Sequence, residues 1–146
     1  MKIDNDSKKF FIAAIIVIAL DLFSKILVRN FIALGQEIRI FGIFSLTHTT
    51  NTGAGFSILQ GYNAVLIWVA VMAMGALAYY INEFKGKSAV WIGMAFGGIA
   101  GNLVDRIAFG RVTDFLDFHY WPVFNIADSA LVLGVIFYAW QTMREK

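Results

Sequence analysis

The sequence has no cysteine, a single proline and few charged residues. Without cysteine, the chain has no disulfide, no thiol nucleophile and no cysteine-based metal site. Charged residues make up 15% of the chain, against about 25% in an average soluble domain, and the mean hydropathy is +0.68. The formal net charge of +2 is too small to indicate nucleic-acid binding. Together these deficits indicate a membrane protein, and 146 residues suit one compact domain.

Four apolar segments predict membrane helices, at residues 10–28, 62–81, 89–104 and 126–143. Because a spanning helix needs about 20 mainly apolar residues, the first two segments qualify directly and the last two need polar turns at their ends. The first segment follows a basic start, as in a signal peptide. No small-residue cleavage site follows it, and Asp21 and Lys25 interrupt its far end, so we interpret it as a retained span. The predicted fold is an all-α membrane protein with four transmembrane helices.

The basic residues predict the orientation of these helices. On one side are the two tails and the loop between the second and third segments, with Lys2, Lys8, Lys9, Lys85, Lys87, Arg144 and Lys146. On the other side are Arg29, Arg39, Arg106 and Arg111, spread over longer loops. Because cytoplasmic loops carry an excess of Lys and Arg, both termini are predicted to be cytoplasmic. The loop of residues 30–61 and the connection between the third and fourth segments are then outside.

Two further patterns concern the architecture. Residues 37–57, "EIRIFGIFSLTHTTNTGAGFS", are rich in Ile, Phe and Thr with partial alternation, which predicts a small extracytoplasmic β-sheet-like loop on the membrane surface. In the third segment, Gly93, Gly97 and Gly101 recur every four residues. This spacing predicts a smooth helix face that a neighbouring helix can approach closely. We see no other sign of an interface between copies, so a monomer is expected.

Two aspartates, Asp114 and Asp128, lie on either side of the second outer connection among apolar residues. Burial disfavours the charged form, and two close carboxylates do not easily both ionise, so such a pair would share one proton. One carboxylate could then take a proton from water while the other donates one to a carbonyl oxygen, as in aspartic peptide hydrolysis. Alternatively, both are solvated loop carboxylates, with Asp128 favoured by a helix dipole. The residues alone leave both interpretations open.

Other ionisable residues lie near the outer ends of the predicted spans. Asp21 and Lys25 are four residues apart on one helix face, as a structural ion pair or as support for a nearby site. Asn102 and Asp105 are three apart and share a face. Arg106 follows Asp105 directly, and a neighbouring opposite charge lowers the pKa of a carboxyl group, so we predict a structural anchor there.

The only histidines are His48 and His119, and neither belongs to a metal-binding spacing such as HExxH. We therefore predict no metal and no cofactor. His119 precedes Tyr120 and Trp121, which are typical of an aromatic belt at a membrane interface.

Five short motifs occur in order along the chain: "DLFSK", "TNTGAGFSIL", "GGIAGNLVDR", "GRVTDFLDF" and "FNIADSA". In this order, and at these places relative to four spans, they resemble the bacterial lipoprotein signal peptidases, also called signal peptidase II. The resemblance covers nearly the full length. One departure is Gly55, where the family more often has alanine.

The resemblance implies an aspartyl endopeptidase of the bacterial cytoplasmic (inner) membrane. Such an enzyme removes the signal peptide from prolipoproteins that carry a diacylglyceryl group on the lipobox cysteine, and it cuts on the N-terminal side of that cysteine. The family's catalytic pair falls on Asp114 and Asp128, at the outer face. The resemblance also implies contact with membrane lipids and inhibition by the cyclic peptide globomycin. Its supporting or substrate-binding positions fall on Asn51, Asn102, Asp105, Arg106, Asn125, Asp21 and Lys25.

Two other functions remain as alternatives. A small four-span transporter could use Asp21, Lys25 and the outer aspartates as a proton or ion relay. The carboxylates cluster at one face instead of following a path through the bilayer, which disfavours a transporter. A non-enzymatic membrane assembly factor would tolerate neutral residues at 114 and 128.

Overall fold

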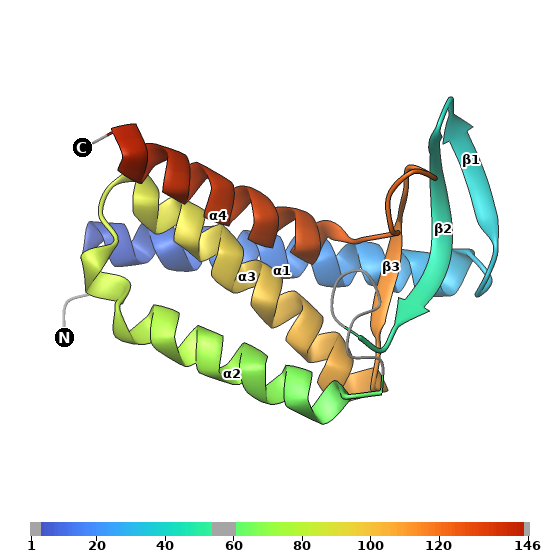
Figure 1. Cartoon of the computed structure of the whole chain (residues 1–146), viewed down its shortest axis with the longest axis horizontal. Coiled ribbons are helices and arrows are strands. Elements are labelled where there is room, and N and C mark those ends of the chain that lie inside the picture. The colour runs from blue at the N-terminus through green and yellow to red at the C-terminus, as the bar shows by residue number, and fades with distance from the viewer. Residues whose placement is uncertain (1–3, 54–60, 145–146) are drawn as a thin grey trace.

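The computed structural model describes residues 4–53 and 61–144. The helices are α1 (Asn5–Phe31), α2 (Asn63–Tyr79), α3 (Lys87–Phe109) and α4 (Ile126–Arg144), with a short 3-10 helix, η2 (Ile81–Glu83). The strands are β1 (Glu37–Phe41), β2 (Phe44–Asn51) and β3 (Val112–Asp117). Successive α-helices run in alternating directions along the bundle, so the start of α1 and the end of α4 lie at one end and the sheet lies at the other (Figure 1).

Helix α3 is the centre of the bundle and contacts α1, α2 and α4. The predicted small-residue face is confirmed, because a Cβ atom at Gly93 would collide with the backbone of Phe10 and one at Gly97 with the backbone of Ala14. A Cβ atom at Gly98, on another side of α3, would likewise collide with the carbonyl oxygen of Ala127 on α4. Glycine therefore lets α3 approach two helices closely enough to fix what its outer end carries.

The four predicted helical segments are confirmed as helices, although their bounds differ. Helix α3 extends beyond residues 89–104 at both ends, through polar turns that the apolar run did not include. Helix α1 begins earlier than residue 10, where the carboxylate of Asp4 caps its N-terminus by accepting from the Ser7 amide at 2.6 Å. A helix boundary is set by capping and hydrogen bonding, which an apolar run alone does not mark.

The outer surface of the bundle is apolar. Within residues 4–53 and 61–144, α1 and α4 are long and apolar enough to cross a membrane, and α2 is an apolar helix of 17 residues. Large side chains such as Ile15, Phe23 and Trp68 are more than half exposed. Soluble monomers rarely expose contiguous apolar patches above a few hundred Å². This surface therefore suits lipid, while the number of crossings stays a prediction.

The sheet is antiparallel, in the order β1-β2-β3. The hairpin of β1 and β2 confirms the strands predicted in the first outer loop, and its turn includes Gly42 at φ +50°. The third strand was not predicted, because the segment around Asp114 was assigned no secondary structure from the sequence. Its side chains are buried almost throughout, so "VTDFLD" lacks the alternation that marks a half-exposed strand.

The sheet is attached to the helices through an apolar cluster of Val28 and Ile32, at the end of α1, and Phe115 of β3. Phe115 and Asp114 are neighbours on one strand, and successive strand residues point to opposite faces. The packing of Phe115 therefore fixes the position and direction of Asp114.

Candidate active site

Asp114 of β3 and Asp128 of the first turn of α4 line one cavity of 740 Å³ at the sheet end of the bundle. Polar residues line the same cavity, namely Thr49, Thr50, Asn51, Thr52, Asn102 and Arg106. Apolar and aromatic side chains complete its wall, namely Val112, Trp121, Pro122, Val123, Phe124, Leu131 and Val132. The two carboxylates, which come from a strand and a helix, are thus brought to one cavity whose wall is partly polar and partly apolar.

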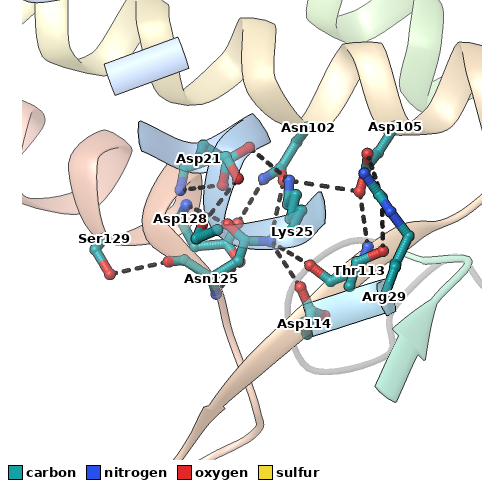
Figure 2. A network of polar contacts seen from close by, with 12 residues as sticks. Asp21, Lys25, Arg29, Asn102, Asp105, Thr113, Asp114, Asn125, Asp128 and Ser129 are labelled. Carbon is teal, nitrogen blue, oxygen red and sulfur yellow. Dashed lines mark hydrogen bonds and ion pairs between the residues drawn. The ribbon is translucent and has the colours of Figure 1, made fainter. Parts of the chain in front are cut away.

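Asn125 connects the two aspartates (Figure 2). Its side-chain amide donates to Asp114 Oδ1 at 2.7 Å, and its backbone N–H donates to Asp128 Oδ2 at 3.3 Å. The Asp128 N–H in turn donates to Asn125 Oδ1 at 2.9 Å. This reciprocal pair of bonds is an N-terminal cap for α4 that also fixes the Asp128 carboxylate.

Asn102 of α3 also binds the Asp128 carboxylate. Its Nδ2 donates to Asp128 Oδ1 at 2.7 Å, and its Oδ1 accepts from Lys25 Nζ at 2.9 Å. Asn102 is buried, whereas Asp128 is partly exposed to the cavity. Asn102 and Asp105 lie on one face of α3, as their spacing predicts, and this face packs against α1.

The predicted pair of Asp21 and Lys25 is confirmed at 2.7 Å, and neither side chain is accessible to solvent. Lys25 Nζ also lies 3.6 Å from Asp105 Oδ2. Asp21 Oδ1 accepts from the Ala127 N–H at 2.9 Å, which ties α1 to the start of α4. The pair therefore braces three helices beneath the cavity.

The expected partner of Asp105 was wrong. Its ion pairs are with Arg29, at 3.0 Å, and Lys25, because Arg106 points from a different side of the same helix. Asp105 Oδ2 also accepts from the Thr113 N–H at 2.9 Å, and Arg29 donates to Thr113 Oγ1 at 3.0 Å. Asp105 thus anchors the start of β3, one residue before Asp114. Sequence reasoning missed Arg29 and Thr113, although Arg29 is four residues after Lys25 and shares its helix face.

Arg106 and Asn51 close the remaining side of the cavity. Arg106 Nη2 donates to the Gly53 carbonyl oxygen at 2.9 Å, and Asn51 Oδ1 accepts from the Gly53 N–H at 2.8 Å. Both residues therefore hold the turn that follows β2. Gly55, the position that departs from the family pattern, lies outside the described residues.

The environment of Asp114 favours its protonated form. The pKa of Asp114 is raised from the ordinary 3.8 to about 7, chiefly by burial and secondly by the nearby Asp128 carboxylate. Hydrogen bonds from Asn125 and Asn51 act in the opposite direction. A carboxyl group with this pKa can hold a proton near neutral pH and also give it up.

The histidines lie away from this cavity. His48 Nδ1 lies 2.7 Å from the Ile32 carbonyl oxygen, so His48 is a buried connection between β2 and the end of α1. His119 Nε2 lies 3.1 Å from Ser45 Oγ, at the far end of the sheet, and its backbone has φ 62°.

Comparison with known proteins assigns the family. A model of the signal peptidase II family matches residues 13–144. The chain belongs to this family. It is 42% identical to the lipoprotein signal peptidase of Halothermothrix orenii, over 90% of this chain and 94% of the relative. It is 37% identical to that of Moorella thermoacetica, over 92% of each. A solved structure described as a bacterial membrane enzyme has a TM-score of 0.89 at 27% identity, over 93% of this chain and 88% of that one.

Family membership confirms the resemblance carried by the five motifs and makes the chain a peptidase of a membrane-enzyme family. The motif "GRVTDFLDF" supplies β3 with Asp114, and "FNIADSA" supplies the start of α4 with Asn125 and Asp128. Residues 13–144 include each of these contacts.

Proposed function

We propose that the protein is a membrane aspartyl endopeptidase that removes the signal peptide from diacylglyceryl-modified prolipoproteins, with Asp114 and Asp128 as its catalytic pair. The bond that it cuts lies on the N-terminal side of the lipid-bearing cysteine. One observation carries the proposal: a buried aspartate, Asp114, and a partly buried one, Asp128, line a single cavity and are connected by one asparagine, at the sheet end of an apolar bundle.

The two aspartates have different roles in this proposal. Asp114 is the protonated member, because its pKa of about 7 lies far above the ordinary value. Asp128 is the ionised member, since it accepts from Asn102 and Asn125 and lies in the first turn of α4, where the helix dipole favours negative charge.

The reaction then follows the aspartic pattern. Asp128 takes a proton from a water molecule, whose oxygen attacks the scissile carbonyl carbon, while Asp114 donates its proton to the carbonyl oxygen. The resulting tetrahedral diol loses its amine when the C–N bond breaks. The proton held by Asp128 goes to the leaving nitrogen, and the proton of one diol hydroxyl returns to Asp114.

Asp105 is a supporting residue in this scheme. Its side chain is fully buried, and its two oxygens already accept from Arg29 and from the Thr113 N–H. Because Asp105 is buried and held by these partners, a substrate atom cannot reach it. Its contribution is to hold β3, and so Asp114, in place.

The membrane arrangement supports the same proposal. We infer four crossings by α1 to α4, with both termini cytoplasmic and the cavity at the outer face of the inner membrane. The alternating helix directions and the apolar outer surface are consistent with this topology (Figure 1). Residues 1–146 would act as a single monomeric peptidase domain. Trp121, Phe124, Leu131 and Val132 give the cavity an apolar wall for the lipid-bearing substrate, and globomycin should compete there.

A cleavage assay with purified protein and a diacylglyceryl-modified prolipoprotein tests the proposal. Wild type should cut, Asp114→Asn and Asp128→Asn should each be inactive, and Asp105→Asn should keep partial activity. Asp117→Asn is the matched control, because Asp117 lies on the same strand and binds Thr47 and the His119 N–H at the sheet. Normal cutting by either Asp114→Asn or Asp128→Asn would refute the assigned pair. A folded wild type that cuts nothing would refute the function, and transport would be tested next.

A further inference from the structure

The orientation of the Asn102 side chain is decided by a lysine. The ammonium group of Lys25 can only donate hydrogen bonds, and it lies 2.9 Å from Asn102 Oδ1. The oxygen of the amide must therefore face α1, which leaves Nδ2 to donate to Asp128 at 2.7 Å. A flipped amide would place its NH₂ group against the ammonium and its oxygen against the carboxylate.

The second asparagine follows the first. Asn125 Nδ2 donates to Asn102 Oδ1 at 3.1 Å and to Asp114 Oδ1 at 2.7 Å, and Asn125 Oδ1 accepts from the Asp128 N–H. A flipped Asn102 would oppose its own NH₂ to that of Asn125. Lys25 therefore favours one orientation of Asn102, which in turn favours one orientation of Asn125. In these orientations the Asn102 amide donates to Asp128 and the Asn125 amide donates to Asp114 (Figure 2).

On the basis of the proposed function, we propose that Lys25 is a positioning residue for the aspartate pair, and that it acts through the amide of Asn102. The ion pair between Lys25 and Asp21 could form without the hydrogen bond from Lys25 to Asn102. The ammonium is fully buried and directs separate contacts to Asp21, Asn102 and Asp105. A lysine that served only to bind α1 to its neighbours would have no effect on which atom of Asn102 faces Asp128.

The first test exchanges Asn102 for aspartate. A carboxylate at this position can still accept from Lys25 and Asn125, so the helices remain paired, but it cannot donate to Asp128. We expect lower thermal stability, because two carboxylates then face each other. We also expect kcat to be lower by at least about 10- to 100-fold, the range for a lost hydrogen bond to a charged group. The acid limb of the pH profile should move to higher pH, because the ionised aspartate loses a donor. Wild-type kcat and an unchanged profile would overturn the proposal.

The second test is a double-mutant cycle on kcat. Lys25→Met is combined with Asp21→Asn, because removing the lysine alone would leave a buried carboxylate without its cation. This charge-balanced change and Asn102→Ala should each lower kcat by about 10- to 100-fold. Together they should be no worse than the stronger of the two, since both remove the same donation to Asp128. If the two reductions in kcat multiplied in the combined variant, the proposal would be overturned.

Arg29→Gln is the matched control for this cycle. Arg29 pairs with the same Asp105 from its other side, and its guanidinium contacts Asp105, Thr113 and the ring of Phe109. Its effect on kcat should therefore multiply with that of Asn102→Ala. If Arg29→Gln coupled to Asn102→Ala as strongly as the change at Lys25 does, a specific role for Lys25 would be overturned. A wild type that cleaves and an inactive Asp114→Asn variant separate failure of this inference from failure of the proposed function.

Discussion

Replacing Asp114 by asparagine should make the protein more stable at alkaline pH while it removes the peptidase activity. Asparagine has nearly the shape of aspartate and still accepts the 2.7 Å hydrogen bond from Asn125, but it does not ionise. In the folded protein the pKa of Asp114 is about 7, against the ordinary 3.8. The folded state therefore binds more protons than the unfolded state between these values, and the wild type loses stability as the pH rises through this interval.

The difference between the two pKa values is worth about 4 kcal/mol once the group is ionised in both states, well above pH 7. Thermal unfolding in detergent, followed by tryptophan fluorescence over a series of pH values, measures this gain. The gain of Asp114→Asn should shrink steadily as the pH is lowered toward the ordinary carboxyl pKa. Asp117→Asn is the control, because it weakens charge-assisted bonds from Thr47 and the His119 N–H and should not stabilise the protein at any pH. A gain that does not depend on pH would refute the reasoning.

Three further predictions concern packing, the cavity and the sheet. Gly98→Ala should lower the thermal unfolding midpoint, since overpacking against the α4 backbone costs about 1–3 kcal/mol, whereas Gly75→Ala has open space and should not. Arg106→Gln should lower kcat/KM by about 10-fold in the cleavage assay, because the turn after β2 loses a charged donor. His48→Phe should cost about 1–3 kcal/mol in thermal unfolding and leave kcat unchanged, because it deprives a buried carbonyl oxygen of its donor.

The parts of the fold that sequence predicts are those with a local signal. Long apolar runs predict the helices, and the partial alternation in residues 37–57 predicts strands in the region that forms the hairpin of β1 and β2. The glycine spacing in α3 predicts a close contact with a neighbouring helix, which in the structure is α1. Asp21 and Lys25, four residues apart, pair as their spacing indicates.

The parts that sequence reasoning missed depend on contacts between distant segments. β3 was missed because both of its faces are buried, so its residues do not alternate. Asp105 pairs with Arg29 and Lys25 of another helix, and spacing along α3 alone suggested its neighbour Arg106. The site roles of Asn102 and Asn125 came only from the family resemblance, because an asparagine in an apolar sequence does not indicate which carboxylate it contacts.

The charges at the sheet end of the bundle explain why Asp21 and Asp105 have different partners from Asp114 and Asp128. Among the described residues that surround the cavity and its support, four are acids and three are cations: Asp21, Asp105, Asp114 and Asp128, with Lys25, Arg29 and Arg106. Lys25 and Arg29 bind Asp21 and Asp105 directly, which leaves one cation, Arg106, for two aspartates in the cavity. One proton makes the cluster neutral, and burial of a net charge is costly. Asp21 and Asp105 are therefore paired with cations, whereas Asp114 and Asp128 accept hydrogen bonds from asparagine side chains. This arrangement favours a cavity pair that holds a single proton.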